Sequence, residues 1–190
     1  MSQSAFSLLA PFYPDMAEKE KGLNYFLVGM VMSSFSFSFV IVSYLVGMKI
    51  NKIGRRFTMV AGIVLQGLSM IGFGWIVWIN DKILFIILSF TFRLLGGVAC
   101  SFIWVAAYAM ITIKYPDNVQ AKISLLEAAN GAGLFVGPIF GGLIYELTHF
   151  CVPFILFTAI FLACIPFLKR ALTPDLDSDD NTDQDKERIG

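Results

Sequence analysis

The amino-acid sequence predicts an all-α fold, a polytopic bundle of transmembrane helices, from its composition and the spacing of its charges. Of the 190 residues, 57% are hydrophobic and only 15% are charged, whereas soluble domains average about 45–50% and about 25%. The charges leave five uncharged windows, at residues 22–48, 57–80, 94–113, 128–145 and 147–168. An uncharged run of about 18 residues or more is long enough to cross the hydrocarbon core of a bilayer as a helix. The sequence therefore predicts a multi-pass integral membrane protein.

Alternating serine and phenylalanine residues in the first window, SSFSFSFVIV at 33–42, raise the alternative of a membrane β-strand. A strand of a membrane β-barrel needs about 9–11 residues before its turn, and this window stays uncharged for more than twice that length. Serine hydroxyl groups in a membrane helix can bond back to the carbonyl oxygen of the preceding turn. We therefore expect a helix here.

The charges between the windows predict the orientation of the helices in the membrane. Lysine and arginine gather in alternate connections: residues 49–56 have four positive charges and no negative one, residues 114–122 have two positive and one negative, and Lys169 and Arg170 close the last window. The intervening connections, at 15–24, 80–82 and 146–149, carry no net positive charge. The basic connections are therefore expected on the cytoplasmic side. Trp75 and Trp78 lie near a predicted outer boundary, as interfacial anchors do.

The two ends of the chain are predicted to differ from a central domain of five spans at 15–170. Residues 1–14 are apolar but too short to cross the membrane, so they are interpreted as part of a first transmembrane helix. Residues 171–190 form an acidic tail that we expect to be disordered, because seven acidic side chains outnumber two basic ones in residues 174–190. The tail is either a solubilising terminus or the start of a loop, or it is an acidic patch that binds a cation or a partner.

Two charged residues interrupt the predicted spans, and such charges usually face a cavity or a partner because they are costly in lipid. Arg93 lies inside the apolar stretch 87–111, and Glu127 follows Lys122 near the start of the next span. Glu127 is either a carboxylate that binds a proton or a cation, or a group near the interface that reaches water or Lys122. Arg93 is either part of a polar network or a structural pair or backbone anchor. An Arg93–Glu127 pair is an arrangement that the sequence leaves open.

The residue types that carry catalytic or metal chemistry are sparse in this chain. There is no phosphate-binding glycine loop, no Ser/His/Asp set and no cysteine–histidine cluster with metal-ligand spacing. The one histidine, His149, falls in a predicted outer connection, and Cys100, Cys151 and Cys164 are interpreted as packing residues. We therefore expect no enzyme activity, no metal, no cofactor and no nucleic-acid partner, and a lipid bilayer as the surroundings.

Glycine and proline, the weakest helix formers in water, are concentrated in the fourth window. Gly133, Gly137 and Gly141 recur at every fourth position and form a smooth ridge along one helix face, and Gly142 follows them. In lipid, helices associate through close backbone approach and van der Waals packing, which such a ridge permits. Pro138 removes a backbone hydrogen bond and bends the helix. We expect a bent helix that slides or seals against a partner helix.

Three motifs in successive spans resemble those of the major facilitator superfamily. Gly133-x-x-x-Gly137-Pro138-x-x-Gly141-Gly142 resembles the antiporter motif of its fifth helix, and Arg93-x-x-x-Gly97 resembles the motif of its fourth. The basic segment Gly47-x-x-x-Asn51-Lys52-x-Gly54-Arg55-Arg56 resembles the motif of the loop between its second and third helices, where the glycine lets the loop turn closely. Two positions depart from these patterns: Asn51 stands where the loop motif usually has aspartate, and Ser124 stands where a further glycine is expected.

The chain is more closely similar to the vesicular amine and polyamine transporters of that superfamily, above all in residues 8–22, 114–119 and 124–146. This resemblance implies one six-helix half of a major facilitator fold with the first helix truncated, in a vesicle, another endomembrane or the plasma membrane. It implies proton-coupled antiport of a small organic cation such as an amine or a polyamine. Glu127 would be the coupling acid, with Arg93 as the second polar candidate. The glycine motif would shape the gating helix, and the segment 49–56 would stabilise one state of the gate.

A half of this kind does not by itself enclose a substrate site that lies between two halves. We therefore expect a second six-helix half or another copy of the chain as a partner. The alternative function is that of a non-transporting membrane scaffold, or of a truncated half-transporter that needs a partner chain.

Overall fold

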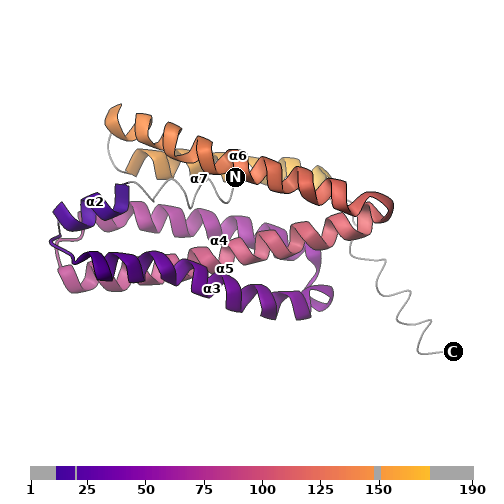
Figure 1. The fold of residues 1–190 in the computed structure, drawn as a ribbon, viewed down its shortest axis with the longest axis horizontal. Helices are drawn as coiled ribbons and strands as arrows, with labels where there is room; N and C mark the ends of the chain where they lie inside the picture. Colours follow the sequence, from indigo (N-terminus) through magenta and orange to yellow (C-terminus); the bar gives the residue numbers. More distant parts are fainter. Residues whose placement is uncertain (1–11, 20, 148–150, 172–190) are drawn as a thin grey trace.

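Every regular element in the described part of the protein is helical, which confirms the all-α prediction. The computed structural model describes residues 12–19, 21–147 and 151–171 (Figure 1). Its helices are α2 (Phe12–Lys19), α3 (Tyr25–Ile53), α4 (Arg55–Trp75), η1 (Ile76–Trp78), α5 (Lys82–Lys114), η2 (Pro116–Asn118), α6 (Val119–Leu147) and α7 (Cys151–Ala171). The serine-rich stretch that raised the strand alternative lies inside α3.

Four of the described helical segments are long and apolar enough to cross a membrane: Tyr25–Ile53, Arg55–Trp78, Lys82–Lys114 and Pro116–Ile144. They overlap most of four predicted windows, and each extends beyond its window at one end or both, because a helix continues through a lysine or an arginine that ends an uncharged window. The fifth window falls mainly in α7, whose apolar part, Phe154–Pro166, is shorter than the four segments. The count of five full spans therefore stays a prediction.

Helix α2 runs through residue 14, where the sequence placed the boundary between the partial first helix and the main domain. It begins at Phe12 and continues to Lys19, because Pro14 stands in its first turn, where a proline costs no intrahelical hydrogen bond. Residues 1–11 and 172–190 lie outside the described residues. Most of the predicted partial first helix and nearly all of the predicted acidic tail fall there.

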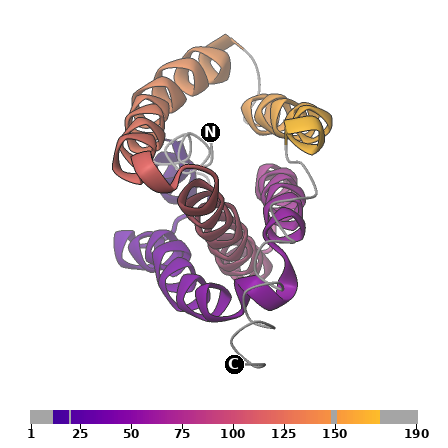
Figure 2. The same cartoon turned by 90° about the vertical axis from the view of Figure 1, so that its right-hand side faces the viewer.

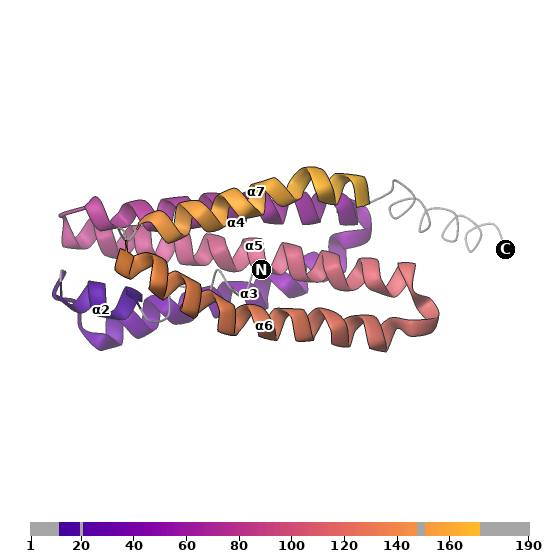
Figure 3. The same ribbon diagram turned by 90° about the horizontal axis from the view of Figure 1, so that it is seen from above.

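Helix α5 lies at the centre of the bundle, as the view along the helices shows (Figure 2). It packs most extensively against α3 and α4, and α4 in turn packs against α7. Figure 3 shows α7 lying along α4. Helix α6 makes only sparse contacts, with α5 and α7. The tightly packed part of the protein is therefore formed by α3, α5, α4 and α7, and α6 is loosely attached to it.

The close approach between α3 and α5 depends on Gly97. A Cβ atom added there would lie 2.9 Å from the Cβ atom of Ser38 and would collide with the backbone of Phe35. At the same contact, the hydroxyl group of Ser38 donates a hydrogen bond to the carbonyl oxygen of Leu94, 2.9 Å away. The serine of α3 and the glycine of α5 therefore hold the two backbones close together, as small residues do in membrane bundles.

We expect Gly97→Ala to destabilise the bundle by about 1–3 kcal/mol, because an added carbon in a well-packed contact forces the backbones apart. The measurement is the midpoint of thermal unfolding of the protein in lipid nanodiscs. Gly29→Ala is the matched control on α3, since a Cβ atom there meets nothing within 4 Å. An unchanged midpoint for Gly97→Ala would mean that α3 and α5 pack less tightly than described here.

The basic connection expected as a loop at 49–56 is almost entirely helical, and this expectation was wrong. Helix α3 continues to Ile53 and α4 begins at Arg55, because no residue before Gly54 breaks the helix. Gly54 alone makes the reversal, with a φ of 92° that other residues rarely adopt. The positive charges therefore lie on the ends of two helices.

Two residues of the loop motif act differently from the expectation. Gly47 lies inside α3 with open space around the position of a Cβ atom, so it does not shape the turn. Arg55, which is buried, donates from Nη2 to the amide oxygen Oδ1 of Asn51, 3.1 Å away. The amide oxygen of Asn51 therefore accepts from this arginine without a negative charge.

Two lysines join the connections at the opposite end of the bundle. Lys21 donates from Nζ to the carbonyl oxygen of Ile79, 2.9 Å away, and Lys82 donates to that of Gly22, 2.8 Å away. Each lysine reaches the other connection, so the two turns are tied in both directions.

Candidate functional site

Arg93, the first charged candidate, is buried between α3, α4 and α5, with 3% of its surface exposed. Its guanidinium carbon lies 5.1 Å from the centre of the Phe73 ring on α4, within the range of a cation–π interaction. Its Nη2 atom donates to the sulfur atom of Met32 on α3, 2.7 Å away. Tyr13 of α2 lies within electrostatic range of the guanidinium group. Arg93 therefore belongs to a buried layer to which four helices contribute.

The spacing Arg93-x-x-x-Gly97 has a structural explanation in this bundle. Residues four positions apart lie on the same face of a helix, so Arg93 and Gly97 both face α3. Because Gly97 lets the backbone of α3 approach, Met32 comes within reach of the guanidinium group. The motif thus couples a close helix contact to the placement of a buried charge.

Glu127, the second charged candidate, lies on α6 with an exposed side chain. Its carboxylate accepts a hydrogen bond from the hydroxyl group of Tyr108 on α5. Lys122, the partner that the sequence offered for Glu127, points elsewhere: its Nζ atom lies 5.1 Å from the centre of the Tyr115 ring. The structure therefore gives Glu127 a phenol as its partner and leaves the carboxylate accessible.

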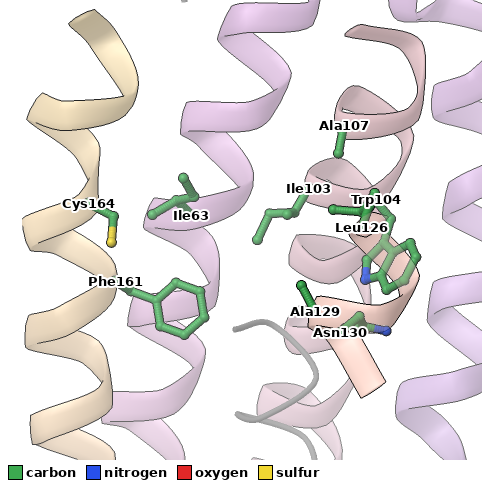
Figure 4. A pocket seen from close by; sticks show the side chains of 9 residues that line it. All are labelled: Ile63, Ile103, Trp104, Ala107, Leu126, Ala129, Asn130, Phe161 and Cys164. Atoms are coloured by element: carbon green, nitrogen blue, oxygen red, sulfur yellow. The ribbon is translucent and has the colours of Figure 1, made fainter. Parts of the chain in front are cut away.

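An aromatic pair continues from Glu127 into the bundle. The rings of Tyr108 and Trp104 lie with their centroids 5.4 Å apart at an angle of 38°. The indole N–H group of Trp104 is buried and has no hydrogen-bond partner among the described residues. Trp104 and Asn130 supply the polar groups to the wall of a cavity of about 210 Å³ between α4, α5, α6 and α7. Figure 4 shows this cavity, with Trp104, Leu126 and Asn130 on one side and Phe161 and Cys164 on the other.

The two charged candidates lie at different levels of the bundle. Glu127 is bound to Tyr108, and Tyr108 lies about 22 Å along α5 from Arg93, given a rise of about 1.5 Å per residue. The structure therefore does not bring Arg93 and Glu127 together, and the pair that the sequence left open is not formed. The two charged residues are therefore separate. Arg93 lies nearer the end of the bundle with Lys21 and Lys82, and Glu127 lies nearer the end with the basic segment 49–56.

The glycine motif lies on α6, which stays a single helix through Pro138. Gly137 and Gly141 are buried, whereas Gly133, Pro138 and Gly142 are partly buried. Large apolar side chains around them are exposed: Phe135, Ile139, Phe140 and Leu143 are each more than half exposed. The described residues therefore leave much of the surface of α6 uncovered.

Trp104, Tyr108 and Asn130 were not predicted as site residues. A signal for them exists in the sequence, since Trp104 and Tyr108 are four positions apart on one face of a predicted helix. Asn130 likewise follows Glu127 by one helical turn. The sequence could not show that α5 would turn this aromatic face toward α6. His149 lies outside the described residues, which contain no group of three or more His, Cys, Asp or Glu side chains that could hold a metal.

Comparisons with known proteins indicate one family. The sequence profile of the Major Facilitator Superfamily matches residues 1–188. The chain is 32% identical to the MFS-type transporter SLC18B1 of Homo sapiens, over 94% of this chain and 39% of that protein. It is 31% identical to the chromaffin granule amine transporter of Homo sapiens, over 76% of this chain and 26% of that protein. The chain therefore spans about two fifths of the length of the first relative and about a quarter of the second.

Proposed function

The chain belongs to the Major Facilitator Superfamily, a family of membrane transporters rather than enzymes, and from that premise we propose that it carries half of a proton-coupled antiporter for a small organic cation. It is a multi-pass integral membrane protein, which we place in a vesicle or another endomembrane, or in the plasma membrane. The names of two relatives, an amine transporter and a vesicular acetylcholine transporter, support an organic cation as the substrate.

The observation that carries this proposal is the accessible carboxylate of Glu127, which accepts a hydrogen bond from Tyr108, a residue whose ring in turn contacts that of Trp104. A carboxylate and the faces of aromatic rings are the groups that attract organic ammonium ions. The same carboxylate also binds a proton, and a single site of this kind holds a proton or a cation but not both. Because Tyr108 donates to Glu127, it orients the carboxylate in the charged state that receives the cation. Competition at this one residue would couple the binding of the cation to the release of the proton.

The remaining motif residues have proposed roles in the gate. The ridge of Gly133, Gly137 and Gly141, with Pro138 and Gly142, would shape the helix that moves against a second six-helix half or another copy of this chain. Its large uncovered surface supports such a partner. The segment from Gly47 to Arg56, with Lys52, would stabilise one state of the gate through the charges on the helix ends beside Gly54.

The test is uptake by the purified protein, as it is expressed, in liposomes with an acidic interior. Radiolabelled tetraethylammonium and spermidine are suitable probes, because their charge keeps them from crossing lipid unaided. We expect uptake that stops when an ionophore collapses the pH gradient, relative to protein-free liposomes. Gradient-independent or absent uptake of both probes would contradict proton-coupled cation antiport, and absent uptake would favour a membrane scaffold or a half-transporter that needs a partner chain.

A further inference from the structure

The connection between α5 and α6 places two lysines at one aromatic ring. The Nζ atom of Lys122, in the first turn of α6, lies 5.1 Å from the centre of the Tyr115 ring. The Nζ atom of Lys114, the last residue of α5, lies 5.9 Å from the same point. Both distances are within the range of a cation–π interaction. The two ammonium groups are therefore at most 11 Å apart.

The turn between the two helices holds this ring in place. The backbone N–H group of Tyr115 donates to the carbonyl oxygen of Ile111, 3.0 Å away, and that of Asn118 donates to the carbonyl oxygen of Tyr115, 3.1 Å away. Pro116 opens η2, and its ring restricts the backbone at that position. The backbone is thus fixed on both sides of the tyrosine, so the two lysines are presented together.

The positive charge of this connection is not balanced within the described part of the chain. Neither lysine forms an ion pair with a described acidic side chain. Asp117 of η2 stands between them in the sequence, but it is exposed and pairs with neither. Two like charges at one ring repel each other. An anion that contacts both ammonium groups would turn this repulsion into attraction.

The surroundings of the two lysines favour a lipid over a soluble anion. Leu125 stands three positions after Lys122, on the same face of α6, and is 66% exposed. Lysine and tyrosine side chains are well suited to the membrane–water interface, where an apolar body lies against lipid tails and a polar tip reaches the headgroups. This end of the bundle, at which α5 meets α6 (Figure 3), is the one predicted to be cytoplasmic. The cytoplasmic leaflet carries anionic lipids.

From this arrangement we propose that the α5–α6 connection binds an anionic phospholipid. The phosphate group of the lipid lies between the ammonium groups of Lys114 and Lys122, and an acyl chain lies along Leu125. The lipid thereby joins the end of α5 to the start of α6. Because α6 makes only sparse contacts with the rest of the described bundle, the lipid supplies an attachment that helix packing does not. This site uses neither Glu127 nor the cavity beside it, so it goes beyond the proposed function.

The test is native mass spectrometry of the purified protein, as it is expressed, in detergent with equal amounts of dioleoylphosphatidylglycerol and dioleoylphosphatidylcholine. The two lipids share their acyl chains and a phosphate group and differ in the net charge of the headgroup. We expect the protein to bind phosphatidylglycerol at least fivefold more tightly, because a lysine near a membrane surface favours an anionic lipid by about fivefold.

Three double variants locate the site. Lys114→Gln with Lys122→Gln should weaken phosphatidylglycerol binding at least fivefold and leave phosphatidylcholine binding unchanged. Lys114→Arg with Lys122→Arg keeps both charges and should bind within twofold of the wild type. Lys49→Gln with Lys52→Gln is the matched control, since it removes the same charge from two exposed positions on α3, and it should change binding less than twofold.

Four results would overturn the proposal. The wild type could bind both lipids equally, or the glutamine variant at Lys114 and Lys122 could bind phosphatidylglycerol like the wild type. An equal loss in the Lys49 and Lys52 variant would assign the attraction to the whole basic end rather than to a site. Displacement of the lipid by excess inorganic phosphate would assign the lysines to a soluble anion.

Thermal unfolding in nanodiscs gives a second measurement and shows that each variant folds. A lipid that binds only the folded protein raises the midpoint of unfolding. Phosphatidylglycerol should therefore raise the midpoint of the wild type relative to phosphatidylcholine, and it should not do so when Lys114 and Lys122 are both glutamine. A rise of the same size in that variant would also contradict the proposed site.

Discussion

Glu127→Gln should lower proton-driven cation uptake by about tenfold to a hundredfold, since a charged hydrogen-bond partner contributes about 1.5–3 kcal/mol and each 1.4 kcal/mol is about tenfold. Glutamine keeps an oxygen that accepts from Tyr108, so the fold around α5 and α6 should be preserved. It carries no charge and takes no proton between neutral and acidic pH. The variant therefore removes both the binding of the cation and the binding of the proton. The measurement is the initial rate of uptake into liposomes with an acidic interior.

Two comparisons make this result specific to the position of the charge. Asp117→Asn removes an exposed carboxylate from η2, near the same end of the bundle, and should leave uptake within about twofold of the wild type, as surface charges contribute little. Glu127→Asp keeps the charge on a shorter side chain and should retain part of the uptake. Wild-type uptake by Glu127→Gln would remove this residue from the coupling mechanism.

The charge of Arg93 should be needed for uptake but not for folding. Arg93→Met keeps an unbranched side chain of similar length beside Met32 and Phe73. The free energy of unfolding should therefore change by less than about 1.5 kcal/mol, as it does for substitutions that conserve volume. Uptake should nevertheless fall at least tenfold, because a buried charge in a membrane span usually marks a functional polar layer. Arg93→Ala removes the side chain as well and should cost about 3 kcal/mol of stability through the cavity that it leaves.

The pair of variants separates the two interpretations of Arg93. If Arg93→Met folds and transports like the wild type, the residue is a structural anchor, and only Arg93→Ala should then be impaired. Lys82→Met is the control on the same helix, since Lys82 is exposed and bonds to a loop carbonyl at the helix end. It should retain uptake. Thermal unfolding of each variant in nanodiscs distinguishes lost transport from lost protein.

The positions of the main helices were predictable from the sequence because they depend on local properties. Uncharged windows gave the helical spans, and helix formation is local to each of them. Gly97 was predicted only as a motif residue, although its small size is what brings α3 and α5 together. The prediction of a loop at 49–56 was wrong for a local reason as well. Charged residues can extend a helix, and only Gly54 interrupts the helix here.

The candidate site was only partly predictable because it depends on which faces of distant helices meet. Arg93 and Glu127 stood out as charges in apolar stretches, and both lie at polar positions. Their partners come from other helices: Phe73 and Met32 for the arginine, and Tyr108 for the glutamate. This chain contains 19 phenylalanine, six tyrosine and eight methionine residues. The sequence therefore gave no reason to prefer these particular residues.

The most direct test of the central claim, that Glu127 holds either a proton or an organic cation, is proton release on cation binding. The purified protein is placed in weakly buffered solution at the pH where uptake is half-maximal, and tetraethylammonium is added while a dye reports the pH. The competition predicts that the wild type releases protons in proportion to the cation bound, as linkage between two ligands requires, and that Glu127→Gln releases none. Saturable binding without proton release by the wild type, or equal release by Glu127→Gln, would contradict the account.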